Sequence, residues 1–123
     1  MFEISEGLAQ FGGNCPICGK YFLPSGVGPE DVPALNTALN NLPSSHILRY
    51  GANYHDFAYH MGSLWGTRLQ ADRLMLSKNK QKIKSLKMGW LKSMFYYTMN
   101  QRNYYAVRMF GGKFWNSKGC KEV

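Results

Sequence analysis

Residues 47–83, ILRYGANYHDFAYHMGSLWGTRLQADRLMLSKNKQKI, predict two helices that are separated by a short break. The first is expected over residues 47–61, with Ser44 or Ser45 as its cap. Glycines at positions 62 and 66 interrupt the pattern. Thr67-Arg68-Leu69-Gln70 has the pattern of a capping box, which predicts a second helix running toward residue 83.

The flanking segments predict further helices. A short amphipathic segment is expected at residues 4–11, and a short helix at residues 29–42 that Pro43 ends. A long helix is expected over residues 88–110, with a loop-like tail from Lys113. Its side chains near helical spacing are Leu91, Met94, Phe95, Thr98, Tyr105 and Met109.

Strand signals are weak throughout the chain. The predicted fold class is therefore all-α, or mainly α with a small β element. We expect one domain over residues 1–123, built on an antiparallel helix pair with a long C-terminal helix and an N-terminal CxxC turn. Some side chains are expected to pack in the core, namely Tyr59, Tyr104, Tyr105, Met75, Met88, Met94 and Met99. Two histidines, His46 and His60, are expected at the surface.

Charge is distributed unevenly along a chain whose net charge is +8. Residues 1–72 hold six acids and three bases, whereas the chain from Arg73 onward holds twelve bases and only Glu122 as an acid. Such a one-sided field attracts polyanions, which are anionic lipid surfaces or nucleic acids. No signal peptide and no membrane-spanning segment is expected, so we expect a protein that is soluble or peripheral to a membrane.

The N-terminal cysteines favour either metal binding or free thiols. Cys15-Pro16-Ile17-Cys18 places two thiols at a spacing that tetrahedral zinc accepts. Completing such a site would need Cys120 and a histidine, or another chain. The alternative is that all three cysteines of this odd set are reduced thiols.

His55 is the strongest candidate for chemistry. On a helix it shares a face with Tyr59, and Asp72 lies in an apolar setting on the following helix, where a buried carboxylate needs a partner. A carboxylate that orients an imidazole makes a general base. Asp56 could hold a hard cation, together with backbone carbonyls from a loop that contains Gly26 and Gly28.

The stretch His55-Asp56-Phe57-Ala58-Tyr59, followed by Asp72, resembles the HD-x-x-Y signature of the phospholipase A2 superfamily. The likeness is to its short, cysteine-poor branch in viral capsid, phage and bacterial proteins, which implies a cytoplasmic or virion-associated location. A family of uncharacterised phage-type proteins looks nearer still, since its A-D-R-x-x helix and its Y-x-A-V-R segment before glycine are similar to residues 71–75 and 104–108. The resemblance covers about residues 21–115.

The resemblance implies a role for each residue of the motif. His55 would activate a water molecule, Asp72 would orient that histidine, and Tyr59 would support Asp72. Asp56 would bind calcium with the loop carbonyls, for which Gly26 and Gly28 are the candidates.

A surface for a charged partner is predicted farther along the chain. The lysines of residues 78–84 point to nearly every side of a helix, which is typical of a solvated helix end. Alternatively, Lys80, Lys82 and Lys84, all expected to face solvent, could meet anionic headgroups while Trp90 enters the lipid boundary.

Three functions remain open on this basis. The first is a calcium-dependent phospholipase A2-like acyl ester hydrolase of phage or bacterial origin, which acts at an anionic phospholipid surface. The second is a catalytically silent structural or interaction protein of a phage on the same fold. The third is a basic, zinc-stabilised module that contacts nucleic acid phosphates through residues 78–92.

Overall fold

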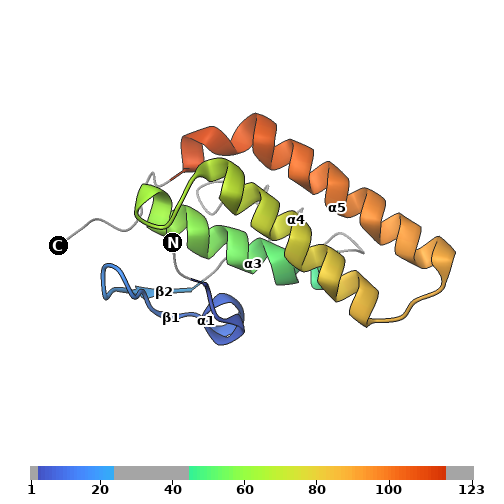
Figure 1. Ribbon diagram of the computed structural model, residues 1–123, viewed down its shortest axis with the longest axis horizontal. Helices are drawn as coiled ribbons and strands as arrows, with labels where there is room; N and C mark the ends of the chain where they lie inside the picture. The colour runs from blue at the N-terminus through green and yellow to red at the C-terminus, as the bar shows by residue number, and fades with distance from the viewer. Residues whose placement is uncertain (1–2, 24–44, 116–123) are drawn as a thin grey trace.

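The computed structural model describes residues 3–23 and 45–115, which are mainly helical and include one two-stranded antiparallel sheet (Figure 1). The predicted class, mainly α with a small β element, is therefore confirmed. The predicted helix at 29–42 and the loop with Gly26 and Gly28 lie outside the described residues. The elements in chain order are α1 (Glu6–Phe11), β1 (Gly13–Asn14), β2 (Tyr21–Phe22), α3 (Ser45–Met61), the 3-10 turn η1 (Gly62–Leu64), α4 (Arg68–Ser85), α5 (Trp90–Phe110) and the 3-10 turn η2 (Gly111–Phe114).

The start of α4 follows the capping pattern in the sequence. The Thr67 hydroxyl accepts a hydrogen bond from the Gln70 backbone N–H at 3.2 Å, and the Gln70 side chain accepts one from the Thr67 N–H at 2.8 Å. These two bonds satisfy donors that a helix start leaves unpaired. Near the C-terminus, residues 111–114 form η2, so the loop-like tail predicted from Lys113 is wrong for Lys113 and Phe114, and residues 116–123 lie outside the described residues.

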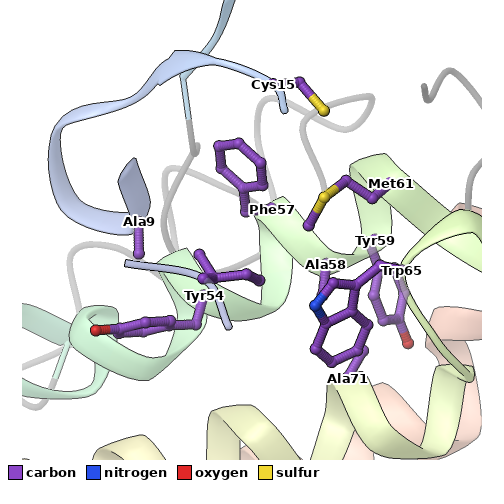
Figure 2. Packing of buried hydrophobic residues seen from close by; sticks show 10 residues of the cluster. Ala9, Cys15, Tyr54, Phe57, Ala58, Tyr59, Met61, Trp65 and Ala71 are labelled. Atoms are coloured by element: carbon purple, nitrogen blue, oxygen red, sulfur yellow. The ribbon is translucent and has the colours of Figure 1, made fainter. Parts of the chain in front are cut away.

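The three long helices form a layer in which α4 packs against both α3 and α5 (Figure 1). α1 packs on α3, and the β1–β2 hairpin lies on the same side of the molecule. The larger core forms where the hairpin, α3 and the start of α4 meet (Figure 2). Its buried members include Cys15, Tyr54, Phe57, Met61, Trp65 and Ala71. A smaller core of Ile47, Leu48, Ile83 and Tyr96 joins the three long helices at the opposite end.

A buried polar network crosses the three long helices. The Asn79 Oδ1 atom accepts a hydrogen bond from the Gly51 backbone N–H at 2.7 Å, and the Asn79 amide donates to Asn100 at 3.2 Å. The Asn100 amide in turn donates to the Leu76 backbone carbonyl at 3.1 Å. A Cβ at Gly51 would clash with the Met75 carbonyl oxygen, so glycine is what allows α3 and α4 to approach.

The outer face of α5 corrects two predicted core positions. Tyr105 is 58% exposed and Met94 is also 58% exposed, whereas both were expected to be buried. The reason is that α5 turns Tyr96 and Asn100 inward, so the apolar side chains on the roughly opposite face of the helix point to solvent. Met75 is buried as predicted. Among the described helices, none is both long enough and apolar enough to cross a bilayer.

Candidate active site around Asp72

Asp72 on α4 is fully buried and accepts three side-chain hydrogen bonds. The His55 Nε2 atom and the Tyr59 hydroxyl, both on α3, each lie 2.7 Å from its Oδ1 atom. The Arg108 Nη1 atom, on α5, donates to Oδ2 at 2.8 Å. The carboxylate therefore gathers donors from both neighbouring helices, and the contact predicted between His55 and Asp72 is present.

The local sequence explains how α3 presents its two donors. His55 and Tyr59 are four residues apart, so they lie on one face of the helix. Their rings pack together with centroids 4.1 Å apart. Tyr59 also packs against Trp115 in a T-shaped arrangement, with ring centroids 5.1 Å apart and ring planes nearly perpendicular. The ring of His55 is thus positioned by packing as well as by its hydrogen bond.

The donors determine the charge of the carboxylate. Burial alone would raise the pKa of Asp72, but hydrogen bonds from His55, Tyr59 and Arg108 outweigh burial and lower that pKa below its usual value. Burial, followed by the contact with Asp72, raises the pKa of Tyr59 well above its usual value. Asp72 is consequently an anion at neutral pH. The Tyr59 hydroxyl stays protonated and donates a hydrogen bond to it.

Two arginines, Arg108 and Arg68, also belong to the site, although their local sequence indicates no role for them. Arg108 is the last residue of the Y-x-A-V-R segment, which is part of the family resemblance. Nothing in its local sequence indicates that it reaches Asp72. The Arg68 Nη2 atom donates to the backbone carbonyls of Val107 and Arg108, at 3.1 and 2.5 Å. This contact satisfies carbonyls at the end of α5 and fixes the turn that presents Arg108.

A proton acceptor results from this arrangement. Because the Asp72 carboxylate can only accept, the bonded Nε2 atom of a neutral His55 ring must carry the proton. The other ring nitrogen, Nδ1, then has a free lone pair, and it makes no hydrogen bond to another residue within ranges 3–23 and 45–115. His55 is buried at 7% exposure. This combination can remove a proton from a small molecule such as water.

The calcium site predicted at Asp56 is described only in part. Asp56 is half-buried on α3, directly after His55. Gly26 and Gly28, the candidate loop residues, lie outside the described ranges. Among the residues that the structure describes, Asp56 does not belong to a group of three or more close acidic, cysteine or histidine ligands.

A separate cluster forms at the N-terminal turn. The Cys15 and Cys18 sulfurs and a ring nitrogen of His60 all lie within 4.8 Å of one another, so the cluster could hold a metal ion. The Cys18 Sγ and His60 Nε2 atoms are 3.6 Å apart. The prediction that His60 lies on the surface is therefore wrong, because its position at the end of α3 brings it half-buried against the hairpin.

The hairpin and α3 shape this cluster together. The Cys15 backbone N–H donates to the Lys20 carbonyl at 2.9 Å, and the Gly19 N–H donates to the Cys15 carbonyl at 2.8 Å. Gly19 has a φ of 75°, a value that glycine adopts without strain. The His60 ring stacks on Phe22 with centroids 4.4 Å apart. Burial and then the charge of Lys20 lower the pKa of His60, which favours its neutral form.

The predicted interfacial residues differ in exposure. Lys80 and Lys84 are exposed, and Trp90 is 71% exposed. Lys82 is only half exposed, because its ammonium group lies over the Tyr50 ring, 5.4 Å from the centroid. The expectation that all three lysines face solvent is thus wrong for Lys82.

Comparison of the chain with protein-family models, with curated proteins and with solved structures gives no match.

Proposed function

We propose that this chain is a phospholipase A2-like acyl hydrolase that cleaves a carboxylic ester of a phospholipid with water. The observation that carries the proposal is the 2.7 Å hydrogen bond between His55 Nε2 and the buried Asp72 carboxylate. The Tyr59 hydroxyl, on the same carboxylate oxygen, fits the part expected of that tyrosine. His55 and Tyr59 occupy the first and last positions of the HD-x-x-Y motif, and Asp72 is the aspartate that follows the motif on the next helix.

The proposed reaction uses His55 as a general base. Its Nδ1 atom takes a proton from water while the oxygen of that water attacks the ester carbonyl. The Asp72 carboxylate stabilises the imidazolium ring that forms, and Tyr59 and Arg108 hold the carboxylate still. The intermediate then expels the alcohol of the lysolipid, which receives the proton from Nδ1. The products are one fatty acid and one lysophospholipid.

Calcium is the cofactor that we propose for this reaction. Within the described residues, Asp56 is the hard-cation ligand beside His55 that would hold it. A bound calcium ion would supply positive charge for the developing negative charge on the ester oxygen. Replacing Asp56 with Asn should therefore weaken the response to calcium while leaving the fold intact.

We propose an anionic phospholipid surface as the substrate. The chain from Arg73 onward is strongly basic, and α4 and α5 both belong to this part. Such a field concentrates the protein at an anionic bilayer. The lysines and arginines of this part of the chain should therefore speed the reaction on anionic vesicles more than on neutral ones.

The test is product analysis after incubation with phosphatidylglycerol vesicles and millimolar calcium. We expect equal amounts of fatty acid and lysophospholipid by mass spectrometry, and we expect both to disappear with His55→Gln. Circular dichroism and thermal unfolding of the variant serve as controls for its fold. Intact lipid in the presence of the wild-type chain would overturn the proposal and favour a structural role.

We further propose that zinc is the metal of the Cys15, Cys18 and His60 cluster. Zinc–sulfur and zinc–nitrogen bonds of about 2.3 and 2.05 Å place tetrahedral ligand atoms about 3.6 Å apart. The distance between Cys18 Sγ and His60 Nε2 is 3.6 Å. Thiolate and imidazole ligands together also bind zinc in preference to calcium or magnesium.

A further inference from the structure

A groove of about 360 Å³ lies between α4 and α5. Its α4 wall carries Arg73, Lys80 and Lys84, and its α5 wall carries Tyr97. Leu76, Ser77 and Gln81 complete the lining. None of the side chains that bond Asp72 takes part in it, so the groove is a second feature of the chain.

The cations of this groove form one row. Arg73, Lys80 and Lys84 are seven and four residues apart, which places them on the same face of α4. The sequence contains no acid from Arg73 to Lys118, so no carboxylate from α5 or from the α4–α5 connection can neutralise them. Three positive charges in a concave site favour a ligand that carries phosphate.

Exposed apolar side chains stand beside the cations. Trp90 and Met94 share the face of α5 that carries Tyr97, because the three are four and three residues apart. Trp90 is 71% exposed, Met94 is 58% exposed and the adjacent Leu91 is 68% exposed. A tryptophan with aliphatic neighbours in solvent suits the boundary region of a bilayer.

This combination distinguishes two polyanions. A nucleic acid strand could lie in the groove and stack a base on an aromatic ring, but it offers nothing apolar for Leu91 and Met94. An anionic bilayer offers both partners, since its phosphates meet the cations and its acyl boundary receives the apolar side chains. The observations therefore favour the bilayer.

We propose that the groove between α4 and α5 binds the phosphate of an anionic phospholipid headgroup while Trp90 and Met94 enter the bilayer boundary. Arg73, Lys80 and Lys84 hold the phosphate, and Tyr97 closes the site from α5. The site anchors the protein on the membrane and takes no part in ester cleavage, so it does not depend on the proposed hydrolysis.

The test compares two triple variants that lose the same charge. The first is Arg73→Gln, Lys80→Gln and Lys84→Gln together, within the groove. The control is Lys87→Gln, Lys92→Gln and Arg102→Gln together, at exposed positions outside it. Sedimentation with vesicles of phosphatidylglycerol and phosphatidylcholine should show affinity falling about a hundredfold for the first variant and less than about tenfold for the control.

Two further readouts complete this experiment. Brominated lipids should quench tryptophan fluorescence in the wild-type chain, and Trp90→Phe should remove that quenching. His55→Gln should bind vesicles with wild-type affinity, because His55 does not line the groove. A failure of the proposed hydrolysis would thus leave the vesicle affinities unchanged.

Either of two results would overturn the inference. Equal loss of affinity in the two triple variants would mean that net charge alone attracts the vesicles. Indifference of the wild-type chain to vesicles, with groove-dependent binding of single-stranded DNA at the same ionic strength, would make nucleic acid the ligand.

Discussion

At the scale of single residues, the chemistry depends on how firmly Asp72 is held. Its two oxygens are shared among His55, Tyr59 and Arg108, and Arg108 is in turn positioned by Arg68 at the end of α5. A buried carboxylate with three donors is both charged and fixed in orientation. Any loss among these donors should move the ring of His55.

Tyr59→Phe should lower the rate of ester cleavage by about tenfold, because it removes a charge-assisted hydrogen bond worth about 1.5 kcal/mol to the proposed base–carboxylate pair. Tyr54→Phe is the matched control, since Tyr54 is also a buried tyrosine of α3 and packs against Tyr50. Its rate should equal that of the wild-type chain. Initial rates on soluble short-chain phosphatidylglycerol give the comparison, and equal rates in the two variants would remove Tyr59 from the mechanism.

Acid should destabilise the fold through Asp72. Its pKa in the native state is lowered from the usual 3.8, so the native state favours the carboxylate. The resulting stabilisation is present above about pH 4 and is lost as the pH falls through the native pKa. Asp72→Asn should therefore cost about 3 kcal/mol at pH 7 and distinctly less near pH 3, as measured by urea unfolding. A cost that does not change between these pH values would contradict this role.

At the scale of elements, the contact between α3 and α4 determines whether His55 meets Asp72. Gly51 permits this contact, because its backbone lies against the Met75 carbonyl and the Asn79 side chain. The buried Asn79 amide then joins α3 to α5 through Asn100. The site is therefore sensitive to changes that separate these helices without touching it.

Gly51→Ala should lower the free energy of unfolding by about 2–3 kcal/mol, because a methyl group there forces α3 and α4 apart. Gly7→Ala is the control, since a Cβ at Gly7 in α1 meets no other atom within 4 Å. That change should leave stability unchanged or raise it by up to about 1 kcal/mol. Urea unfolding of the two variants would contradict the account if both had the same effect.

The β1–β2 hairpin should depend on metal. It has two residues in each strand, and a hairpin of this size needs other contacts to be stable. Chelation of zinc should lower the unfolding temperature and increase amide hydrogen exchange in residues 13–22, and His60→Ala should do the same without chelator. Magnesium should not restore either property. Protein that retains no zinc after purification without chelator would contradict the proposed metal site.

At the scale of the whole molecule, the sequence was informative where signals are local. The capping box at Thr67, the spacing of His55 and Tyr59, and the need of Asp72 for a partner predicted the start of α4 and one central contact. Helix periodicity also located α5, but it did not tell which face would be covered. Met94 and Tyr105 face solvent because α4 packs on the opposite, partly polar side.

The contributions of Arg108 and His60 could not be derived from their neighbours in sequence. Arg108 reaches Asp72 across 36 residues, and His60 reaches Cys18 across 42 residues. Both contacts arise only when the helices and the hairpin pack. A histidine near the end of α3 looks like a surface residue until the hairpin lies against it.

The acidic and the basic parts of the chain form different helices of the fold. The helix that carries His55 belongs to the acidic part of the chain, whereas α5 and most of α4 belong to the basic part. Asp72 lies at the boundary between them, where its negative charge is matched by Arg108 from the basic part. The proposed base is thus held between the part of the chain that carries the candidate metal ligands and the part that carries most of the positive charge.

The proton position on the His55 ring tests the central claim most directly. Nitrogen-15 NMR of the labelled protein distinguishes the two neutral tautomers through couplings between ring nitrogens and ring protons. We predict that the neutral ring carries its proton on Nε2, toward Asp72, and that Asp72→Asn abolishes this preference. A neutral His55 ring with its proton on Nδ1 would contradict the account, because that nitrogen could no longer accept a proton from water.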